Sequence, residues 1–538
     1  MNTKTCILSL ALLCGLPAAA QQSLSTEVVV DRTVEPAERA AVRPAGLYPR
    51  LVLPAARRTA PSTASYEGYG AVDRMYTPLG AIAEPGLPAA SPYRGYAMLG
   101  YFPVYNLGVS AGYRILDTER TRLGVWGQFD GTSYKAPACD DARMRYNGGR
   151  IGASLRQAFG AASRLDVKLS GGYATYRSAA YDSQSLGSGE LSAVWSSRAG
   201  RVDYSAGIRG FIDSYGDIAA ADGIPATDGP AQQQGGFEAA AAYDFDGASR
   251  AGLEAAGDWL HSSVSAGSPT LGIVRLTPYY SYSSRQFAAR LGAEVDLLTG
   301  GTGGKVHVAP SVMVSWTPAG TFAMYLTARG GDRLNALRTL REYTPYLPGL
   351  YAAGRSQVPV DATIGFNVGP LKGLAVGVFA SYASASDAAM PMAATVAPVT
   401  QTDVKALRGG IEASYAWRTL VRVSARAEFA QSSASHAWYE WLDRASSVVS
   451  ASLEVTPLER LAVRVTYDWR GGRRILLPRE GTASLGCVSD LGAGATYGIT
   501  PAIDVFARVD NILGRRHMLL PGIESRGLHG LAGVQLKF

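Results

Sequence analysis

The stretch LAVRVTYDWR, residues 461–470, alternates between apolar side chains and small or polar ones. The odd positions hold Leu461, Val463, Val465, Tyr467 and Trp469, and the even positions hold Ala462, Arg464, Thr466, Asp468 and Arg470. Because a β-strand points successive side chains to opposite faces, this stretch predicts a strand with one hydrophobic face and one charged face.

The same alternation recurs along most of the chain, for example in residues 164–173, 201–212, 287–297, 421–429 and 502–510. A soluble β-sandwich also alternates, but its strands usually have about 5–6 residues. Here the alternating stretches run for about 10–13 residues, and a tilted strand needs about 9–11 to cross a bilayer. The pattern therefore predicts an all-β protein, a transmembrane antiparallel β-barrel, because only a closed sheet satisfies its backbone groups inside lipid.

The spacing of the alternating stretches predicts about 22 strands. They are expected to start near residues 95, 105, 119, 144, 162, 185, 200, 233, 250, 272, 286, 305, 320, 358, 372, 405, 419, 442, 459, 483, 500 and 526. Connections after even strands read as short turns. Those after odd strands read mostly as long loops, at 131–143, 176–184, 214–232, 331–357, 385–404, 431–441, 472–482 and 512–525. Short periplasmic turns and long outer loops are typical of outer-membrane barrels, and residues 95–538 would form the barrel.

The polar faces of these strands carry charges of both signs, which suits an aqueous lumen. The side chains expected to face the lumen are Arg290, Glu294, Asp296, Arg422, Arg426, Glu428, Arg464 and Asp468. Tyr and Trp residues near the strand ends, such as Trp438, Tyr439, Trp441, Trp469 and Tyr497, are expected to form aromatic girdles at the two membrane interfaces.

The first 20 residues read as a signal peptide, with Lys4, an apolar stretch and small residues before Gln21. Residues 21–94 are rich in Ala, Pro and Arg, and they are expected to form an extended periplasmic segment. Within that segment Thr26, Glu27, Val28, Val29 and Val30 form a possible docking strand. It could serve as a strand that an energy-coupling partner pairs with, or as an anchor on another protein, and we favour the anchor.

The C-terminal segment, residues 506–538, ends in alternating apolar residues and a terminal aromatic, Val534, Leu536 and Phe538. This ending resembles the signature that the barrel-assembly machinery recognises in outer-membrane barrels. The turn at 509–513 and the Pro521-Gly522 pair resemble the last hairpin of TonB-dependent receptors, which implies a 22-stranded barrel. Those receptors also hold a large plug domain, and residues 21–94 are too few for one, so a relative without a full plug is expected.

Other stretches are open to more than one interpretation. The loop 331–357 contains NALRTLRE, which could form a short helix, and could either fold into the lumen or remain an ordinary outer loop. Asp213, Asp217, Asp222 and Asp228 could bind calcium, but a solvated acidic loop is the simpler interpretation. The five histidines show no metal-binding spacing, and no nucleophile motif is visible, so we expect no cofactor, no metal site and no enzyme.

Taken together, the sequence predicts an integral outer-membrane barrel of TonB-dependent-receptor type that acts as a solute channel or transport-related barrel. The alternative is a structural or accessory subunit of an outer-membrane complex. The expected partners are outer-membrane lipid, the assembly machinery and possibly other outer-membrane or periplasmic proteins. The net charge of +7 over 538 residues, without a basic block, argues against nucleic acid.

Overall fold

The computed structural model describes residues 93–538, except 104, 161, 180–182, 218–227, 264–269, 301–304, 320, 342–344, 347–353, 392–398, 419, 435–444, 477–481 and 521. The signal peptide, residues 21–92 of the N-terminal segment with its docking strand, and the girdle residues Trp438, Tyr439 and Trp441 lie outside the described residues. No helix among the described residues is long and apolar enough to cross a membrane.

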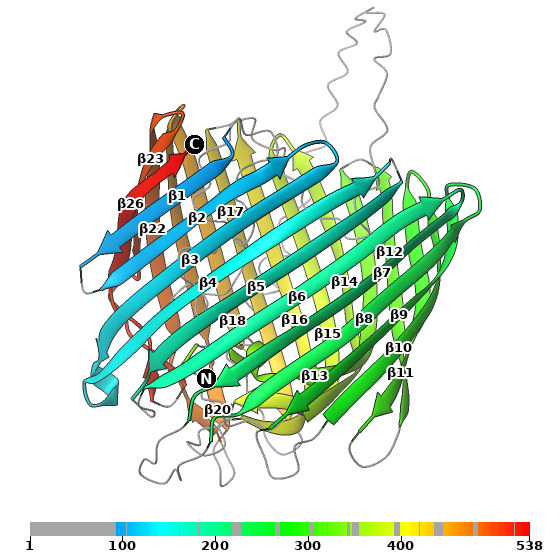
Figure 1. Cartoon of the computed structure of the whole chain (residues 1–538), viewed down its shortest axis with the longest axis horizontal. Coiled ribbons are helices and arrows are strands. Elements are labelled where there is room, and N and C mark those ends of the chain that lie inside the picture. Colours follow the sequence, from blue (N-terminus) through cyan, green and yellow to red (C-terminus); the bar gives the residue numbers. More distant parts are fainter. Residues whose placement is uncertain are drawn as a thin grey trace, which may run out of the picture. The chain divides into compact units, whose positions relative to one another are not determined.

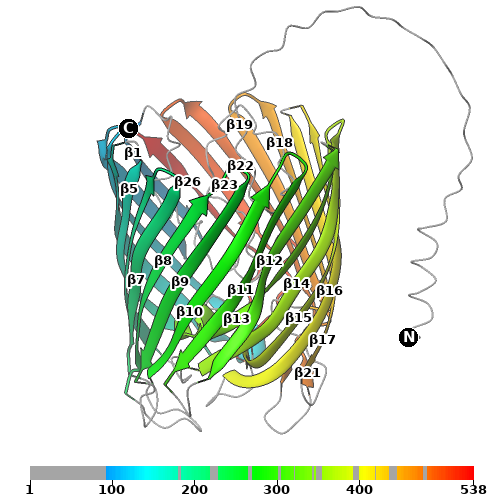
Figure 2. The same cartoon turned by 90° about the vertical axis from the view of Figure 1, so that its right-hand side faces the viewer.

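Twenty-two strands form one closed antiparallel barrel (Figures 1 and 2). The first eleven are β1 (Gly95–Phe102), β2 (Asn106–Asp117), β3 (Thr121–Ala136), β4 (Ala142–Phe159), β5 (Ser163–Arg177), β6 (Gln184–Ala199), β7 (Val202–Tyr215), β8 (Ala231–Asp244), β9 (Ser249–Ser262), β10 (Thr270–Ser283) and β11 (Phe287–Thr299). The others are β12 (Val306–Ala319), β13 (Phe322–Asn335), β14 (Gly354–Leu371), β15 (Leu374–Pro391), β16 (Val399–Trp417), β17 (Val421–Ala434), β18 (Ser447–Leu458), β19 (Leu461–Gly471), β22 (Val488–Thr500), β23 (Ile503–Asp510) and β26 (His529–Lys537).

The remaining described elements lie in the connections. They are the 3-10 turn η1 (Pro137–Cys139), the helix α3 (Leu337–Arg341), and two small hairpins, β20 (Arg474–Leu476) with β21 (Thr482–Ser484) and β24 (Met518–Leu520) with β25 (Ile523–Glu524). The helix lies within the stretch NALRTLRE, as predicted.

The last strand closes the barrel on the first. β26 pairs antiparallel with β1, with Tyr96 opposite Lys537 and Tyr101 opposite Ala532. The amide of Phe538 donates to the carbonyl of Gly95 at 3.0 Å, and the Phe538 ring stacks on Tyr113 with 6.2 Å between ring centroids. The predicted fold class and strand count are confirmed, and every predicted strand start lies within six residues of an observed one.

Connection length separates the two ends of the barrel. At one end, which we call the short-turn end, ten connections have two to four residues. In the turn between β14 and β15, Lys372 and Gly373 have φ values of 51° and 91°, a pair of positive φ angles that favours glycine and suits a tight two-residue hairpin. The other end, the long-loop end, carries all the longer connections. The longest of them are 336–353, 472–487 and 511–528.

Several predicted loops proved too long, and two of them by the largest fraction. β3 and β4 continue to Ala136 and from Ala142, so the predicted loop 131–143 reduces to 137–141, and β15 and β16 shorten 385–404 to 392–398. The strands therefore reach 16–19 residues in β3, β4, β14, β15 and β16. The prediction was wrong because the apolar side chains near these ends, such as Tyr134 and Met144, change to the inner face, where they are buried.

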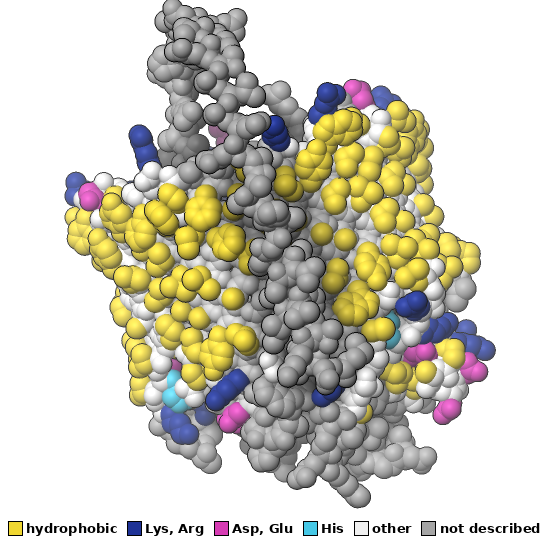
Figure 3. Space-filling model, turned by 180° about the vertical axis from the view of Figure 1, so that it is seen from behind, with side chains coloured by type: hydrophobic (Ala, Val, Ile, Leu, Met, Phe, Trp, Pro, Cys, Tyr) yellow, Lys and Arg dark blue, Asp and Glu magenta, His cyan; other side chains and the backbone are white. Residues whose placement is uncertain are grey.

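On the face of the barrel seen in Figure 3, hydrophobic side chains cover most of the visible outer surface, and Lys and Arg side chains lie near its upper and lower edges. Ile151, for example, is 71% exposed, and Leu169, Tyr173, Leu291 and Phe429 are also exposed. A hydrophobic band bounded by polar edges is what a barrel needs to lie in a bilayer. In a closed barrel with this outer surface, the charged face of each strand is the inner one.

Candidate functional site

Charged side chains on neighbouring strands of the inner face pair with one another. Arg422 on β17 lies opposite Glu454 on β18, which lies opposite Arg464 on β19. The Glu454 carboxylate is 3.9 Å from the Arg422 guanidinium and 3.4 Å from that of Arg464. Directly opposite charges of unlike sign stabilise a sheet, so this row is a cross-strand ion-pair ladder.

A second ladder lies beside the first. Arg426 on β17 contacts Glu428 two positions along its own strand at 2.9 Å and Glu412 on β16 at 3.6 Å.

Asp468 is buried on β19, directly opposite Asp490 on β22. The Asp490 carboxylate accepts the Asn511 amide at 2.8 Å, which ties this part of the wall to the loop 511–528.

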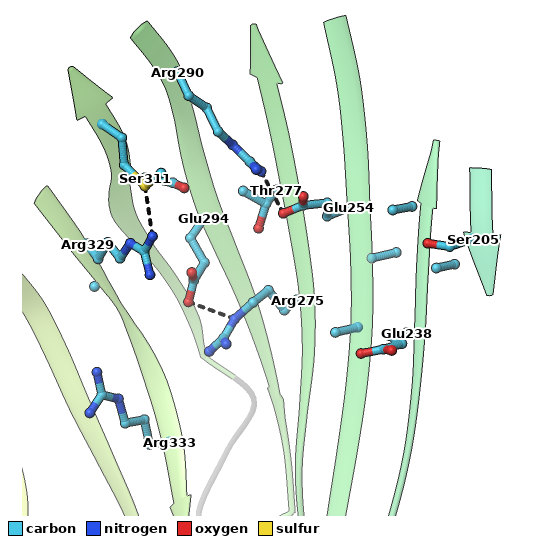
Figure 4. Close-up of a pocket in the computed structure, with 16 residues that line it drawn as sticks. Ser205, Glu238, Glu254, Arg275, Thr277, Arg290, Glu294, Ser311, Arg329 and Arg333 are labelled. Carbon is cyan, nitrogen blue, oxygen red and sulfur yellow. Dashed lines mark hydrogen bonds and ion pairs between the residues drawn. The ribbon is translucent and has the colours of Figure 1, made fainter. Parts of the chain in front are cut away.

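A pocket of about 560 Å³ lies on the wall formed by β7 to β13 (Figure 4). Arg290 on β11 reaches Glu254 on β9 at 2.6 Å, and Arg275 on β10 reaches Glu294 on β11 at 2.7 Å. The pocket is also lined by Ser205, Glu238, Thr277, Ser311, Arg329 and Arg333. Four guanidinium groups and three carboxylates therefore surround this space, and we call it the wall pocket.

Asp296 is buried beside the wall pocket and binds Arg275, one of the residues that line it. Its carboxylate accepts from the Nε of Arg275 at 2.8 Å and from the amide of Asp332 at 2.6 Å. The Asp332 carboxylate in turn contacts Nδ1 of His307 at 2.8 Å. The sequence pattern did not identify three of these residues as part of a site: Arg275, Glu254 and Asp332. Arg275 lies on the polar face of the alternating stretch 270–283 and could have been found by the same rule that identified Arg290.

A hydrophobic cluster lies at the long-loop end, and its members come from opposite sides of the barrel. We call it the inner cap; it contains Tyr134, Ala136, Met144, Tyr176, Tyr215, Leu337, Tyr346, Ala389, Ile475, Val488, Leu519 and Ile523. Leu337 and Tyr346 come from the connection between β13 and β14, whereas Tyr134 lies on β3. β3 and β13 are ten strands apart in a ring of 22, so the cluster spans the bore.

Polar contacts hold the first part of the connection 336–353 to the wall formed by β6 to β8, five to seven strands away from β13. The Leu337 amide donates to the side-chain oxygen of Gln232 on β8 at 2.7 Å. Arg338 donates to both carboxylate oxygens of Asp213 on β7, at 2.8 and 3.0 Å, and to Glu190 on β6 at 3.1 Å. Its guanidinium also stacks over the Phe211 ring at 4.1 Å. The described part of this connection therefore folds into the lumen, which agrees with the first of the two interpretations above.

Two other connections contribute to the same cap. The Tyr134 hydroxyl donates to the carbonyl of Glu524 at 2.8 Å, and the Glu524 carboxylate accepts the Ala138 amide at 3.1 Å. Arg473 donates to the carbonyl of Met518 at 3.0 Å and so joins the loop 472–487 to the loop 511–528. Burial raises the pKa of the Tyr346 hydroxyl well above its usual value, and the neighbouring Tyr134 adds to that increase.

The four aspartates for which a solvated acidic loop was the simpler interpretation have different surroundings, and Asp213 is buried on β7. Asp213 binds Arg338, whereas Asp217 accepts the amide of Gly229 at 2.8 Å, and Asp222 lies outside the described residues. Within the described ranges no three His, Cys, Asp or Glu side chains are placed to hold a metal ion.

No protein-family model and no curated protein matches the sequence. Solved structures do match. The FrpB iron transporter from Neisseria meningitidis aligns with a TM-score of 0.65 at 11% identity, over 84% of this chain and 81% of that one. The ferripyoverdine receptor of the Pseudomonas aeruginosa outer membrane aligns with 0.61 at 11%, over 83% and 72%. The copper transporter OprC aligns with 0.61 at 10%, over 83% and 80%. The chain therefore has the 22-stranded barrel fold of TonB-dependent receptors.

Proposed function

We propose that this protein is an outer-membrane barrel that moves a solute through its lumen, with the inner cap as its closure at the long-loop end. The observation that supports this most strongly is the position of the wall pocket inside a charged lumen, where Arg290 and Glu294 face open space of about 560 Å³. A purely structural barrel has no need of such a space. The similar folds described above include two proteins named as transporters, which is consistent with this proposal.

The proposal includes an orientation. An even number of strands brings both ends of the barrel sequence to the short-turn end, and short turns face the periplasm in outer-membrane barrels. Residues 21–94 would then lie in the periplasm as a lead segment in place of a full plug, with Thr26–Val30 available for docking to a partner. The eight lumen charges predicted from the sequence would line the path of the solute.

The alternative is an accessory subunit of an outer-membrane complex. It is favoured by the paired state of charges such as Arg422, Arg464 and Glu454, because ion-paired side chains have less capacity to bind a passing solute. The hydrophobic interior of the cap also favours it, since a packed core of this kind resists opening.

Conductance distinguishes the two functions. Purified protein comprising residues 21–538 would be placed in planar bilayers, beside a form that lacks 21–94. Transport through a capped lumen predicts small, infrequent openings in the intact protein, which a variant that loosens the cap makes longer. An accessory role predicts no openings in either form, together with a stable protein partner that co-purifies. Large permanent steps in the intact protein would contradict the cap as a closure.

A further inference from the structure

Four basic side chains lie on the outer face of three adjacent strands at the long-loop end. On β4, Arg143 and Arg145 share the odd-numbered face with Ile151, whose side chain is exposed to the outside. On β3, Lys135 shares its face with the exposed Phe129, and on β5, Arg177 shares its face with the exposed Leu169 and Tyr173. We call Lys135, Arg143, Arg145 and Arg177 the outer basic cluster.

The register places these cations directly beside one another. Lys135 lies opposite Arg143, and Arg145 lies opposite Arg177. Like charges directly opposite in a sheet are destabilising, so the Lys135–Arg143 pair has a cost that an anion over it would offset. The guanidinium of Arg516 adds a further positive charge, because its Nη1 donates to the carbonyl of Lys135 at 2.5 Å.

Acidic side chains are absent from the outward positions of β3, β4, β5 and β6 among the described residues. Asp140 and Asp141 lie in the turn beyond the ends of β3 and β4. The long-loop end is not uniformly basic, since on β16 Lys405 shares its outward face with Asp403 two residues away. The positive charge is therefore concentrated over β3 to β5.

The height of the cluster matches the level of lipid headgroups. On β4 the outward face runs from Phe159 through Leu155 and Ile151 to Arg145. Fourteen residues at about 3.3 Å each, on a strand tilted by about 45°, give roughly 33 Å along the barrel axis. The apolar band of such a barrel is about 25 Å tall, so Arg145 and Arg143 lie just beyond its edge.

We propose that the outer basic cluster binds the phosphate groups of a phosphorylated lipid in the leaflet that surrounds the long-loop end. Guanidinium groups bind phosphate oxygens in a bidentate manner, and several cations in register suit a headgroup with more than one phosphate. The acyl chains of the same lipid would pack on the exposed apolar residues below, such as Ile151 and Leu169. The inference depends on the membrane placement of the barrel and is independent of whether the lumen conducts.

The test uses the purified protein, residues 21–538, in a neutral detergent, titrated with diphosphoryl lipid A and followed by native mass spectrometry. The double variant R143Q/R145Q removes one member of each opposed pair, and K405Q is the matched control at the same end of the barrel. We expect saturable binding to the unmodified protein and to K405Q, and at least about tenfold weaker binding to the double variant. Phosphatidylcholine, which is zwitterionic, should not saturate the cluster.

Two further comparisons show whether the bound phosphate belongs to a lipid or to a free anion. Millimolar inorganic phosphate should compete poorly, because it lacks the acyl chains that pack on the apolar band; full competition would assign the cluster to a soluble anion and overturn the lipid proposal. Equal lipid A binding by R143Q/R145Q and the unmodified protein would also overturn it. Folding of each variant is checked by heat-modifiable gel mobility, and if the double variant does not fold, K135Q and R145Q separately serve the same comparison. Each single variant should bind lipid A more weakly than K405Q does.

Discussion

The substitution Arg338→Met tests whether the inner cap closes the lumen. Arg338 extends from α3 to Asp213 on β7, six strands away around the barrel, and makes two hydrogen bonds of 2.8 and 3.0 Å to its carboxylate. The side chain of Asp213 is only 3% exposed, whereas that of Arg338 is 28% exposed. Methionine keeps much of the length of the arginine side chain and removes its charge, so Asp213 is left buried with no cation from the cap.

The expected cost follows from that burial. Removing one partner of a buried ion pair costs about 3–5 kcal/mol, and the partial exposure of Arg338 places this pair at the lower end, about 3 kcal/mol. If the cap opens and closes as a unit, this raises the open population about 150-fold. Because the opening frees the same segment that spans the bore, conductance and amide exposure should increase together.

Hydrogen exchange at Leu337 measures the opening directly. Its amide is buried and donates to Gln232 at 2.7 Å, so it exchanges only when α3 leaves the wall. We expect exchange of the peptide that contains Leu337 to be faster by up to about 150-fold in R338M, and openings in planar bilayers to become longer. For hydrogen exchange the variant R333M is the matched control, since Arg333 lies five residues earlier on β13, outside α3.

A double variant separates charge burial from loss of packing. In R338M/D213N the buried carboxylate is removed together with its cation, and only the more exposed Glu190 carboxylate remains, so the double variant should exchange more slowly than R338M alone. If R338M exchanges as R333M does and conducts as the unmodified protein does, the cap is held by its hydrophobic cluster alone and the argument from Arg338 is wrong.

Three further results are expected. Burial, helped by two nearby arginines, lowers the pKa of His517 to about 3, so below pH 6.5 the unfolded loop takes up a proton that the folded loop does not. The loop 511–528 should therefore lose about 2 kcal/mol of stability by pH 5, seen as faster hydrogen exchange, and His517→Asn should abolish this loss. Burial also raises the pKa of the Cys139 thiol, so maleimide at pH 7 should label the exposed Cys487 first, and equal labelling rates would show that Cys139 is not shielded. Phe538→Ala should sharply reduce the amount of assembled barrel, measured by heat-modifiable mobility, yet barely change the melting temperature of what does assemble, because the Phe538 ring is 59% exposed; normal yields would exclude its role in assembly.

The barrel could be predicted from the sequence because its two determinants are local. Alternation with a period of two identifies each strand, and connection length identifies its direction, so both are readable in a stretch such as 461–470 and in the short turns around it. The same rule assigns Arg422, Arg464 and Arg426 to one strand face. It says which face a residue occupies but not which partner it meets.

The inner cap could not be predicted for that reason. Arg338 and Asp213 are separated by 125 residues, and Tyr134 and Glu524 by 390, and nothing in either local pattern specifies the pairing. Asp213 was visible as one of four nearby aspartates, and the solvated loop favoured for them is wrong for this residue, which is buried. The cation that the structure supplies is a guanidinium from a loop on another part of the ring.

The strand ends near the long loops show one further physical principle. Within the membrane band the apolar side chains face outward, as in Phe129 and Ile151, whereas beyond it they face inward, as in Tyr134 and Met144, and the charged residues Lys135 and Arg143 change to the outside. This inversion occurs without a break in the strand, because the solvent outside changes from hydrocarbon to headgroups and water while the lumen is filled by the cap.

The inversion places the two proposed sites back to back on the same strands. Tyr134 and Met144 belong to the inner cap, and Lys135 and Arg143, their immediate neighbours in sequence, belong to the outer basic cluster. Since successive side chains of a strand lie on opposite faces, R143Q/R145Q should leave hydrogen exchange at Leu337 unchanged, and R338M should leave lipid A binding unchanged. If either variant affected both readouts, the strand ends themselves would be moving, and the cap and the lipid contact would have to be treated as one coupled element.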